Sequence, residues 1–272
     1  MVHYYLFIVS SLNHPIYRQI QKKRRYLLDR YQIPYTVLIN EKESPMDDRT
    51  VDTLLPLEYD EILYPIEASV PTMTQKFLSG VRQYFRSFPS ENDIPNFIVR
   101  INATVYIHFP KLKEQMEGLP HTRMIAGPMY AEDSFIVGML MIFSKDVLLN
   151  ILKDPAIYDK DIMSGPDDVV LTHLGRKYGQ TYNIMDHFVY PNESTLDRDG
   201  LYNLNAIEPH RHQKWYFRLC DWGSGRSTDL KNWDRLVGYF ESERKPDHGK
   251  KIWWIILILI IFIGGIILMI YR

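Results

Sequence analysis

Short apolar runs alternate with amphipathic helical segments in this chain, and this alternation constrains the fold more than any other feature. Residues 4–9 and 35–39 are apolar runs that predict buried strands, and segment 15–31 between them carries apolar residues at helical spacing. A helical pattern over 72–88 and an apolar run over 96–102 repeat the arrangement. Because strand, helix and strand in succession form the unit of a parallel sheet, we predict an α/β fold with a mixed, mainly parallel sheet flanked by helices.

The rest of the chain continues the alternation. We predict further strands at 61–66, 123–127, 135–143, 181–190 and 214–219, and helices at 110–117, 144–152, 166–179 and 228–240. Ser164 or Gly165 is expected to cap the helix that starts with Pro166, because small polar residues and glycine suit the cap and proline suits the first turn. Residues 1–240 are expected to form one domain.

The C-terminal end has a different composition. Residues 252–271 are a run of 20 residues without a charge, between Lys251 and Arg272. A helix of this length spans roughly 30 Å, the thickness of a hydrocarbon core, whereas the alternative, a buried core helix, is usually shorter. We therefore predict one C-terminal transmembrane helix at 252–271, joined to the domain by a polar tether at 241–251.

Almost no chain follows the predicted span. We therefore expect a single-pass, tail-anchored membrane protein, with the lipid bilayer as a partner and the N-terminal domain in the cytosol. The formal net charge of -1 gives no indication of nucleic-acid binding. The single cysteine, Cys220, excludes an internal disulfide.

Polar residues follow two of the predicted strands at the edge where ligands of parallel α/β sheets gather. They are Ser10, Ser11 and Asn13 after the first strand, and Arg100, Asn102 and Thr104 at the end of strand 96–102. Arg100 stands in an otherwise apolar run, where an unpaired guanidinium is costly. It either binds a phosphate or carboxylate of a ligand, or forms an internal ion pair, for instance with Asp168.

Two carboxylates, Asp167 and Asp168, fall in the first turn of the helix from Pro166. One interpretation is helix capping, because acidic groups are stabilised at helix N-termini. The other makes one of them a general base that takes a proton from a hydroxyl. The Gly-rich segment 223–229 could suit a phosphate, but it matches no nucleotide-binding fingerprint. The basic run 22–25 is interpreted as a solvated helix face.

The order and spacing of several segments resemble nucleotide-sugar glycosyltransferases of the GT-A fold. These segments are Arg100-Ile-Asn-Ala-Thr-Val-Tyr106, Phe109-Pro-Lys-Leu112, Ala126-Gly127, the run from Gly138 to Val147, and Asp167-Asp168-Val-Val170. The chain is similar to Fringe and β-1,3-galactosyltransferases, and more so to the glycosyltransferases of giant DNA viruses, which implies that its membrane is a host or virion membrane.

The resemblance implies a GT-A-like fold, a nucleotide-diphospho-sugar donor and a hydroxyl acceptor. It makes Asp168 the candidate base with Asp167 beside it, and it places Gly138 at the donor site. Two further segments, Tyr216-Phe-Arg218 and Arg226-Ser-Thr-Asp229, align with C-terminal motifs of the family. The resemblance implies that Arg218 and Arg226 neutralise the diphosphate of the donor.

The chain departs from the family pattern at the metal site. Asn102-Ala-Thr104 offers no carboxylate, and Tyr216 stands where relatives carry a histidine. Mn²⁺ and Mg²⁺ prefer carboxylate oxygens, so metal dependence is left open and no metal ligand is assigned. Two hypotheses follow: a membrane-anchored glycosyltransferase, or a catalytically inactive GT-A-like domain that serves as a structural or interaction module on a membrane or virion.

Overall fold

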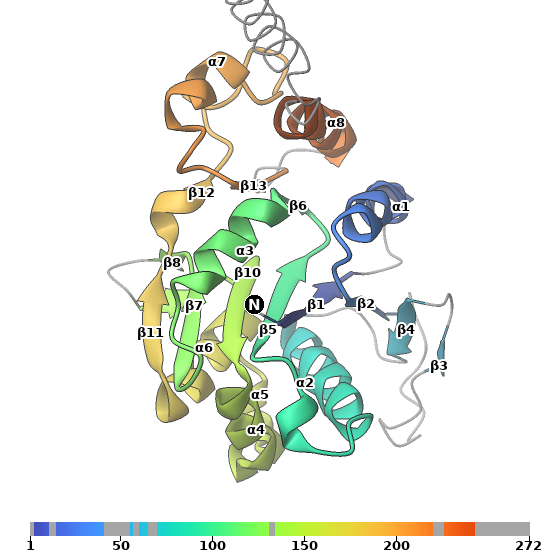
Figure 1. Ribbon diagram of the computed structural model, residues 1–272, viewed down its shortest axis with the longest axis vertical. Coiled ribbons are helices and arrows are strands. Elements are labelled where there is room, and N and C mark those ends of the chain that lie inside the picture. The colour runs from blue at the N-terminus through green and yellow to red at the C-terminus, as the bar shows by residue number, and fades with distance from the viewer. Residues whose placement is uncertain are drawn as a thin grey trace, which may run out of the picture. The chain divides into compact units, whose positions relative to one another are not determined.

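The computed structural model describes residues 3–10, 15–40, 55–56, 60–64, 70–130, 134–219 and 226–242. The chain divides into two compact units, residues 1–233 and 234–272. Figure 1 labels the helices and strands and colours them in chain order. The described part of the second unit consists of the last residues of helix α8 (Asp229–Glu241) and Ser242. All other elements belong to the first unit. The predicted domain end near residue 240 stays a prediction.

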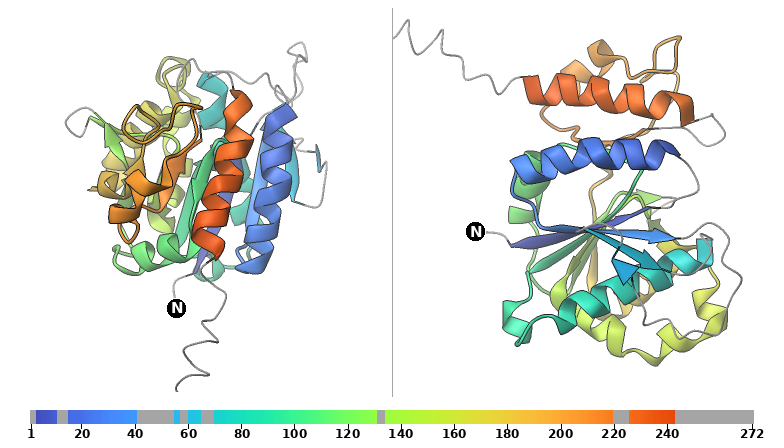
Figure 2. Two further views of the ribbon diagram at one scale, coloured as in Figure 1. Left: turned by 90° about the horizontal axis from the view of Figure 1, so that it is seen from above. Right: turned by 90° about the vertical axis from the view of Figure 1, so that its right-hand side faces the viewer.

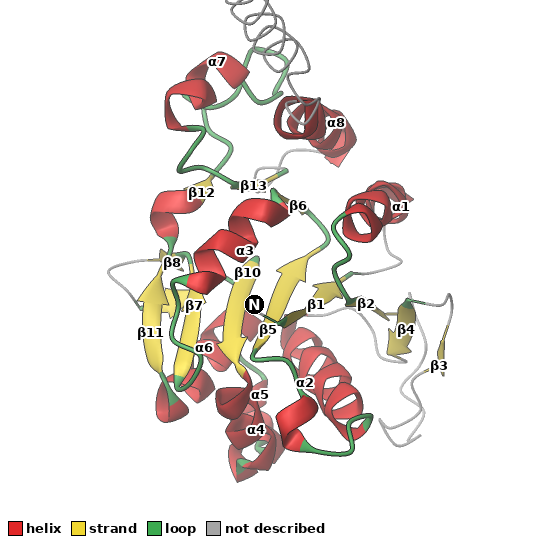
Figure 3. Cartoon of the chain, in the orientation of Figure 1, coloured by secondary structure: helices red, strands yellow, loops and turns green. Residues whose placement is uncertain are grey.

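The first unit is built on an eight-stranded sheet in the order β11-β7-β10-β5-β1-β2-β4-β3 (Figure 3). Its strands are β1 (Tyr4–Val9), β2 (Tyr35–Asn40), β3 (Leu55–Pro56), β4 (Glu61–Tyr64), β5 (Phe97–Asn102), β7 (Met124–Gly127), β10 (Leu140–Ser144) and β11 (Gln180–Asn183). The neighbours β5-β1-β2-β4 and the pair β7-β11 are parallel, whereas β10 and β3 run antiparallel to the strands beside them. The predicted mixed, mainly parallel sheet is therefore present.

Helices cover both faces of this sheet (Figure 2). Helices α2 (Val70–Arg86), α4 (Lys145–Lys153) and α6 (Asp167–Tyr178) enclose the main core, with Phe77 of α2, Ile98 of β5 and Leu171 of α6 all buried. Each buried side chain of this size stabilises the fold by roughly 1.5–3 kcal/mol. Helices α1 (Pro15–Arg30) and α3 (Phe109–Glu117) cover the other face, where α1 lies opposite α2 and α4 in the right-hand view of Figure 2.

Two small sheets complete the unit. The first has the order β12-β13-β6 and is made of β12 (Phe188–Val189), β13 (Tyr216–Arg218) and β6 (Val105–Ile107). The second pairs β8 (Met129–Tyr130) with β9 (Phe135–Ile136). Two short helices, α5 (Lys160–Met163) and α7 (Leu204–Ile207), lie in the connections. Only two residues separate the end of β5 from the start of β6, and β13 pairs with β6. Strand β13 therefore lies just beyond the end of β5.

Three predicted elements are wrong in detail. The predicted strand 135–143 is two strands, β9 and β10, because the chain turns between residues 137 and 139. The predicted strand 181–190 is also divided, with β11 in the large sheet and β12 paired with β13. Helix α6 starts at Asp167, and its cap is Pro166, which has no side-chain donor or acceptor, instead of Ser164 or Gly165.

The basic run 22–25 is not a solvated face throughout. Arg24 is buried and donates to the carbonyl oxygens of Ala103 at 2.8 Å and Val105 at 2.7 Å. Arg25 forms ion pairs with Asp60 at 2.7 Å and Glu61 at 2.8 Å. Helix α1 therefore turns two of its cations toward the sheet.

The predicted fold class included a C-terminal transmembrane helix, and that part is corrected. Among the described residues, none of the helices is both long and apolar enough to cross a bilayer. The segment 252–271, to which the prediction applied, and most of the predicted tether 241–251 lie outside the described residues.

Candidate functional site

The carboxyl ends of β1 and β5 meet at one edge of the large sheet. The two strands are parallel and in register, with Val9 opposite Asn102, and the amide of Ala103 donates to the carbonyl of Val9 at 2.9 Å. The amide of Asn102 donates to the carbonyl of Met139 at 3.2 Å, which brings the turn before β10 to the same edge. The first turn of α6 lies against that turn, because Asp168 contacts Gly138.

A compact group of residues, here called the edge cluster, fills this place: Arg100, Gly138, Asp167, Asp168 and Lys76. Arg100 is fully buried at the centre of it. Its guanidinium donates to the carbonyl oxygen of Gly138 and to a carboxylate oxygen of Asp167, while its Nε has no partner among the described residues. Of the two possibilities for Arg100, the structure shows the internal ion pair, made with Asp167 in place of Asp168.

Gly138 leaves no room for a side chain. A Cβ atom at this position would lie 2.9 Å from Nη1 of Arg100 and 3.0 Å from Cβ of Asp168. Both distances are too short for ordinary contact, and the neighbouring atoms belong to a buried ion pair and to a helix. The glycine therefore allows the turn to approach both Arg100 and the start of α6.

Asp168 is the carboxylate of the pair that is not held by Arg100. It is half-buried, and its Oδ1 accepts from the amide of Val169 at 3.0 Å, while its Oδ2 lies 3.4 Å from the amide of Gly138. Burial and the neighbouring Asp167 raise the pKa of Asp168, and the two amide donors and Arg100 oppose that shift. A carboxylate with a raised pKa takes up a proton more readily, which suits a general base.

Lys76 was missed by sequence reasoning. It lies on α2, is almost fully buried, and donates from Nζ to the carbonyl oxygen of Ser10 at 2.6 Å. Burial, and after it the charge of Arg100, lowers the pKa of Lys76 to about 7, while Asp167 acts in the opposite direction. The available signal was its position beside Phe77, on the apolar side of the predicted helix.

The two arginines of the C-terminal part lie on other elements than the edge cluster. Arg218 is the last residue of β13, which pairs with β6, and its guanidinium lies 5.4 Å from the ring centre of Tyr190. The guanidinium carbon of Arg226 lies 4.9 Å from the ring centre of Tyr17, and Tyr17 is in the first turn of α1. Nη1 of Arg226 also lies 3.6 Å from a carboxylate oxygen of Asp229. Neither arginine pairs with Asp168 in the part of the chain that the structure describes.

The remaining predicted residues fall into two groups. Ser10 and Asn102 lie at the edge cluster, and the carbonyl oxygen of Thr104 accepts from the amide of Leu219 at 2.9 Å, which ties the end of β5 to the end of β13. Ser11 and Asn13 lie outside the described residues, as does most of the Gly-rich segment 223–229.

The side chains that the structure describes at this edge do not fit Mn²⁺ or Mg²⁺. Asn102 and Thr104 have neutral side chains. Among the described residues, Asp167 is the carboxylate that contacts a side chain of β5, and it is paired there with Arg100. Burial raises the pKa of Tyr216 well above its usual value, so its hydroxyl stays protonated. Within the described ranges, no group of three or more His, Cys, Asp or Glu residues could hold a metal ion.

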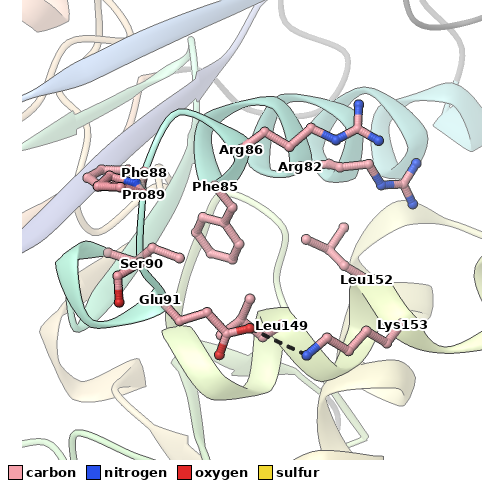
Figure 4. A pocket seen from close by; sticks show the side chains of 11 residues that line it. Arg82, Phe85, Arg86, Phe88, Pro89, Ser90, Glu91, Leu149, Leu152 and Lys153 are labelled. Carbon is pink, nitrogen blue, oxygen red and sulfur yellow. Dashed lines mark ion pairs between the residues drawn. The ribbon is translucent and has the colours of Figure 1, made fainter.

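A separate hollow lies at the opposite end of β5 (Figure 4). It has a volume of about 290 Å³, and its walls come from the end of α2, the loop before β5 and helix α4. Phe85 and Leu152 form part of an apolar floor, and an exposed ion pair of Glu91 with Lys153, 3.5 Å apart, crosses its rim. It is distinct from the edge cluster.

No protein-family model and no curated protein sequence matches the chain. Among solved structures, it is similar to a glycosyltransferase involved in the glycosylation of the major capsid of PBCV-1, with a TM-score of 0.46, 12% identity, and coverage of 85% of this chain and 98% of that one. It is similar to the galactosyltransferase LgtC, with a TM-score of 0.44, 9% identity, and coverage of 88% and 95%. It is similar to the glycosyltransferase GlyE of Streptococcus pneumoniae TIGR4, with a TM-score of 0.39, 10% identity, and coverage of 89% and 64%. Each of these three structures is a glycosyltransferase.

Proposed function

We propose that this chain is a glycosyltransferase that moves a sugar from a nucleotide-diphospho-sugar to a hydroxyl group of an acceptor. The observation that carries the proposal is the state of Asp168. It is a half-buried carboxylate with a raised pKa at the carboxyl edge of the sheet, while its neighbour Asp167 is held by Arg100. Asp168 is left partly accessible at the carboxyl edge of the sheet, where ligands of parallel α/β sheets gather, and this favours the general base over helix capping alone.

The proposed reaction assigns one role to each group. The Asp168 carboxylate takes the proton of the acceptor hydroxyl as the acceptor oxygen forms a bond to the anomeric carbon of the donor. The bond from that carbon to the diphosphate oxygen breaks, and its electron pair leaves with the nucleoside diphosphate. Guanidinium groups can stabilise that developing charge, because they form paired hydrogen bonds to phosphate oxygens. Arg218 and Arg226 are the residues proposed for this role.

Arg100 and Asp167 are positioning residues in this proposal. Their ion pair is buried, so it acts by holding the Gly138 turn against the first turn of α6. Through that contact it orients the carboxylate of Asp168. Ser10 and Asn102 lie beside the pair, where a donor is expected to bind.

The test is turnover by Asp168→Asn. We expect release of nucleoside diphosphate from a panel of uridine and guanosine diphosphate sugars to fall by about 10²–10⁴-fold, since the amide cannot accept a proton, while donor binding is retained. In the unchanged protein the rate should fall as the pH drops through the pKa of Asp168, which lies above the ordinary value of about 3.9. The matched control is Asp161→Asn, an exposed aspartate on α5. Equal rates for the two variants would remove Asp168 from the mechanism.

The second candidate function is a catalytically inactive domain of the same fold that acts as a structural or interaction module. The neutral residues Asn102 and Thr104 at the end of β5 favour it, because the carboxylates of the family pattern are missing there. Binding of nucleoside diphosphate without turnover of any donor would support this alternative over the enzyme.

A further inference from the structure

We propose that this chain binds the diphosphate of its donor without a divalent cation, through the guanidinium groups of Arg218 and Arg226. The inference rests on the proposed function, since it concerns how the same site holds the same class of donor. It starts from the disagreement between the metal that the resemblance implies and the side chains found at the edge.

The first line of evidence is the neutral donor set at the end of β5. Asn102 offers a neutral amide oxygen in place of a carboxylate, and its Oδ1 is buried without a hydrogen-bond partner among the described residues. Tyr216 is fully buried, and its hydroxyl also has no partner within the described part. Because Mn²⁺ and Mg²⁺ need several oxygen ligands and favour charged ones, these groups are a poor site for either ion.

The second line is the charge beneath the edge. Arg100 and Lys76 are buried cations from β5 and α2, and each influences the other electrostatically. Arg100 is paired with the carboxylate of Asp167. Lys76 donates to the neutral carbonyl oxygen of Ser10. Asp167 neutralises Arg100, so Lys76 in its protonated form is the cation that adds positive charge here, and that charge attracts an anionic diphosphate and repels a divalent cation.

The third line is the position of Arg218 and Arg226. Arg218 ends the strand that pairs with β6, and Tyr216, two residues earlier, is within the electrostatic influence of both Arg218 and Arg100. Arg226 lies over Tyr17, at the start of the helix that follows β1. The backbone of Arg218 therefore pairs with the strand that follows β5, its guanidinium lies over Tyr190, and the guanidinium of Arg226 lies against the helix that follows β1. Arginine binds phosphate oxygens in paired fashion, which lets it take over the neutralising role of a metal ion.

The experiment is calorimetry of the full-length chain with uridine diphosphate and guanosine diphosphate, once in EDTA and once in MnCl₂. We expect binding in EDTA, with a Kd within about threefold of the value in manganese. Arg226→Ala should weaken binding roughly 10–100-fold in EDTA, because a charge-assisted contact to phosphate is lost. Arg86→Ala, an exposed arginine of α2 at the far end of β5, is the matched control and should bind as the unchanged protein does.

A reverse variant makes the test independent of any loss of folding. Asn102→Asp combined with Thr104→Asp restores the spacing of two carboxylates. We expect this variant to bind nucleotide more weakly in EDTA and to recover in manganese, because it repels the phosphates until a metal ion is bound.

The outcomes separate this inference from the proposed function. Binding by the unchanged protein that needs manganese, with a Kd at least about tenfold tighter in its presence, would overturn the inference and leave the transferase proposal standing. An unchanged Kd in Arg226→Ala and in Arg218→Ala would overturn the assignment to arginine. No binding of either nucleotide in either buffer would overturn both proposals.

Discussion

At the scale of single residues, the arginine within β5 explains how the edge cluster is organised. Arg100 is fully buried, and a guanidinium in such a place must be neutralised and hydrogen-bonded. Asp167 neutralises it, and Gly138 supplies a carbonyl acceptor because the absence of a side chain lets the turn come close. The same contacts leave Asp168 at the edge.

Breaking this ion pair should destabilise the protein strongly. We expect Asp167→Asn to lower the free energy of unfolding by about 3–5 kcal/mol, because the charge of Arg100 stays buried without compensation. The double variant Arg100→Met with Asp167→Leu should recover much of that loss, since no buried charge remains. Urea unfolding of the single and double variants measures both effects.

The control for that measurement is an exposed ion pair. Glu91 and Lys153 are 3.5 Å apart with side chains 65% and 69% exposed, so Glu91→Gln should change the free energy of unfolding by less than about 1 kcal/mol. An equally small change in Asp167→Asn would show that the buried pair does not hold the cluster together.

At the scale of elements, the connection from β5 to β6 depends on a side chain from a distant helix. Arg24 of α1 donates to the carbonyl oxygens of Ala103 and Val105, which flank the turn between these strands. Its guanidinium also lies 5.0 Å from the ring centre of Trp233, in the first part of α8. Helix α1 thereby fixes the turn from which β6, and through it β13, is placed beside the edge.

Replacing Arg24 should therefore lower the free energy of unfolding, although its position in a basic run predicts an exposed side chain that contributes little. We expect Arg24→Leu to lower the free energy of unfolding by about 2–4 kcal/mol, because two buried carbonyl oxygens lose their donors. Lys22→Leu, at an exposed position of the same helix, should change it by less than about 0.5 kcal/mol. Equal denaturation midpoints for the two variants would contradict the assigned role of Arg24.

At the scale of the whole molecule, the buried cations link stability to pH. The pKa of Lys76 is lowered to about 7 in the folded protein, mainly by burial, whereas an unfolded lysine titrates near about 10.4. Between these values the unfolded chain binds more protons than the folded one, so this group makes the protein more stable as the pH rises. Below pH 7 the lysine is charged in both states, and its burial is least favourable to folding.

The expected result is a pH-dependent difference between the unchanged protein and Lys76→Met. From pH 7 to pH 9.5, Lys76 should raise the free energy of unfolding of the unchanged protein by up to about 1.4 kcal/mol per pH unit, and Lys76→Met should lack this rise. Urea unfolding at several pH values measures the difference, with Lys22→Met as the exposed control. Parallel pH profiles for the unchanged protein and Lys76→Met would show that Lys76 titrates normally.

Much of the large sheet could be predicted from the sequence, because apolar periodicity is a local property. The strands at 4–9, 35–39 and 96–102 and the helices at 15–31 and 72–88 are present with shifts of one or two residues at their ends. Predictions failed where a partner distant in sequence decides the element. Strand β12 leaves the large sheet because β13 supplies its partner, and β9 and β10 separate because the turn at Gly138 must meet Arg100.

For the site, the sequence alone determined that Arg100 needs an acceptor and that Asp167 and Asp168 stand at a helix start near the carboxyl edge of a sheet. Only the tertiary structure decided which carboxylate Arg100 takes, because neighbouring helical residues point about 100° apart and only the packing of α6 against β5 selects one. It likewise decided that Lys76 turns inward to Ser10, because its surroundings come from strands distant in sequence. Periodicity is local and could be read from the residues, whereas the pairing of charges depends on which segments the fold brings together.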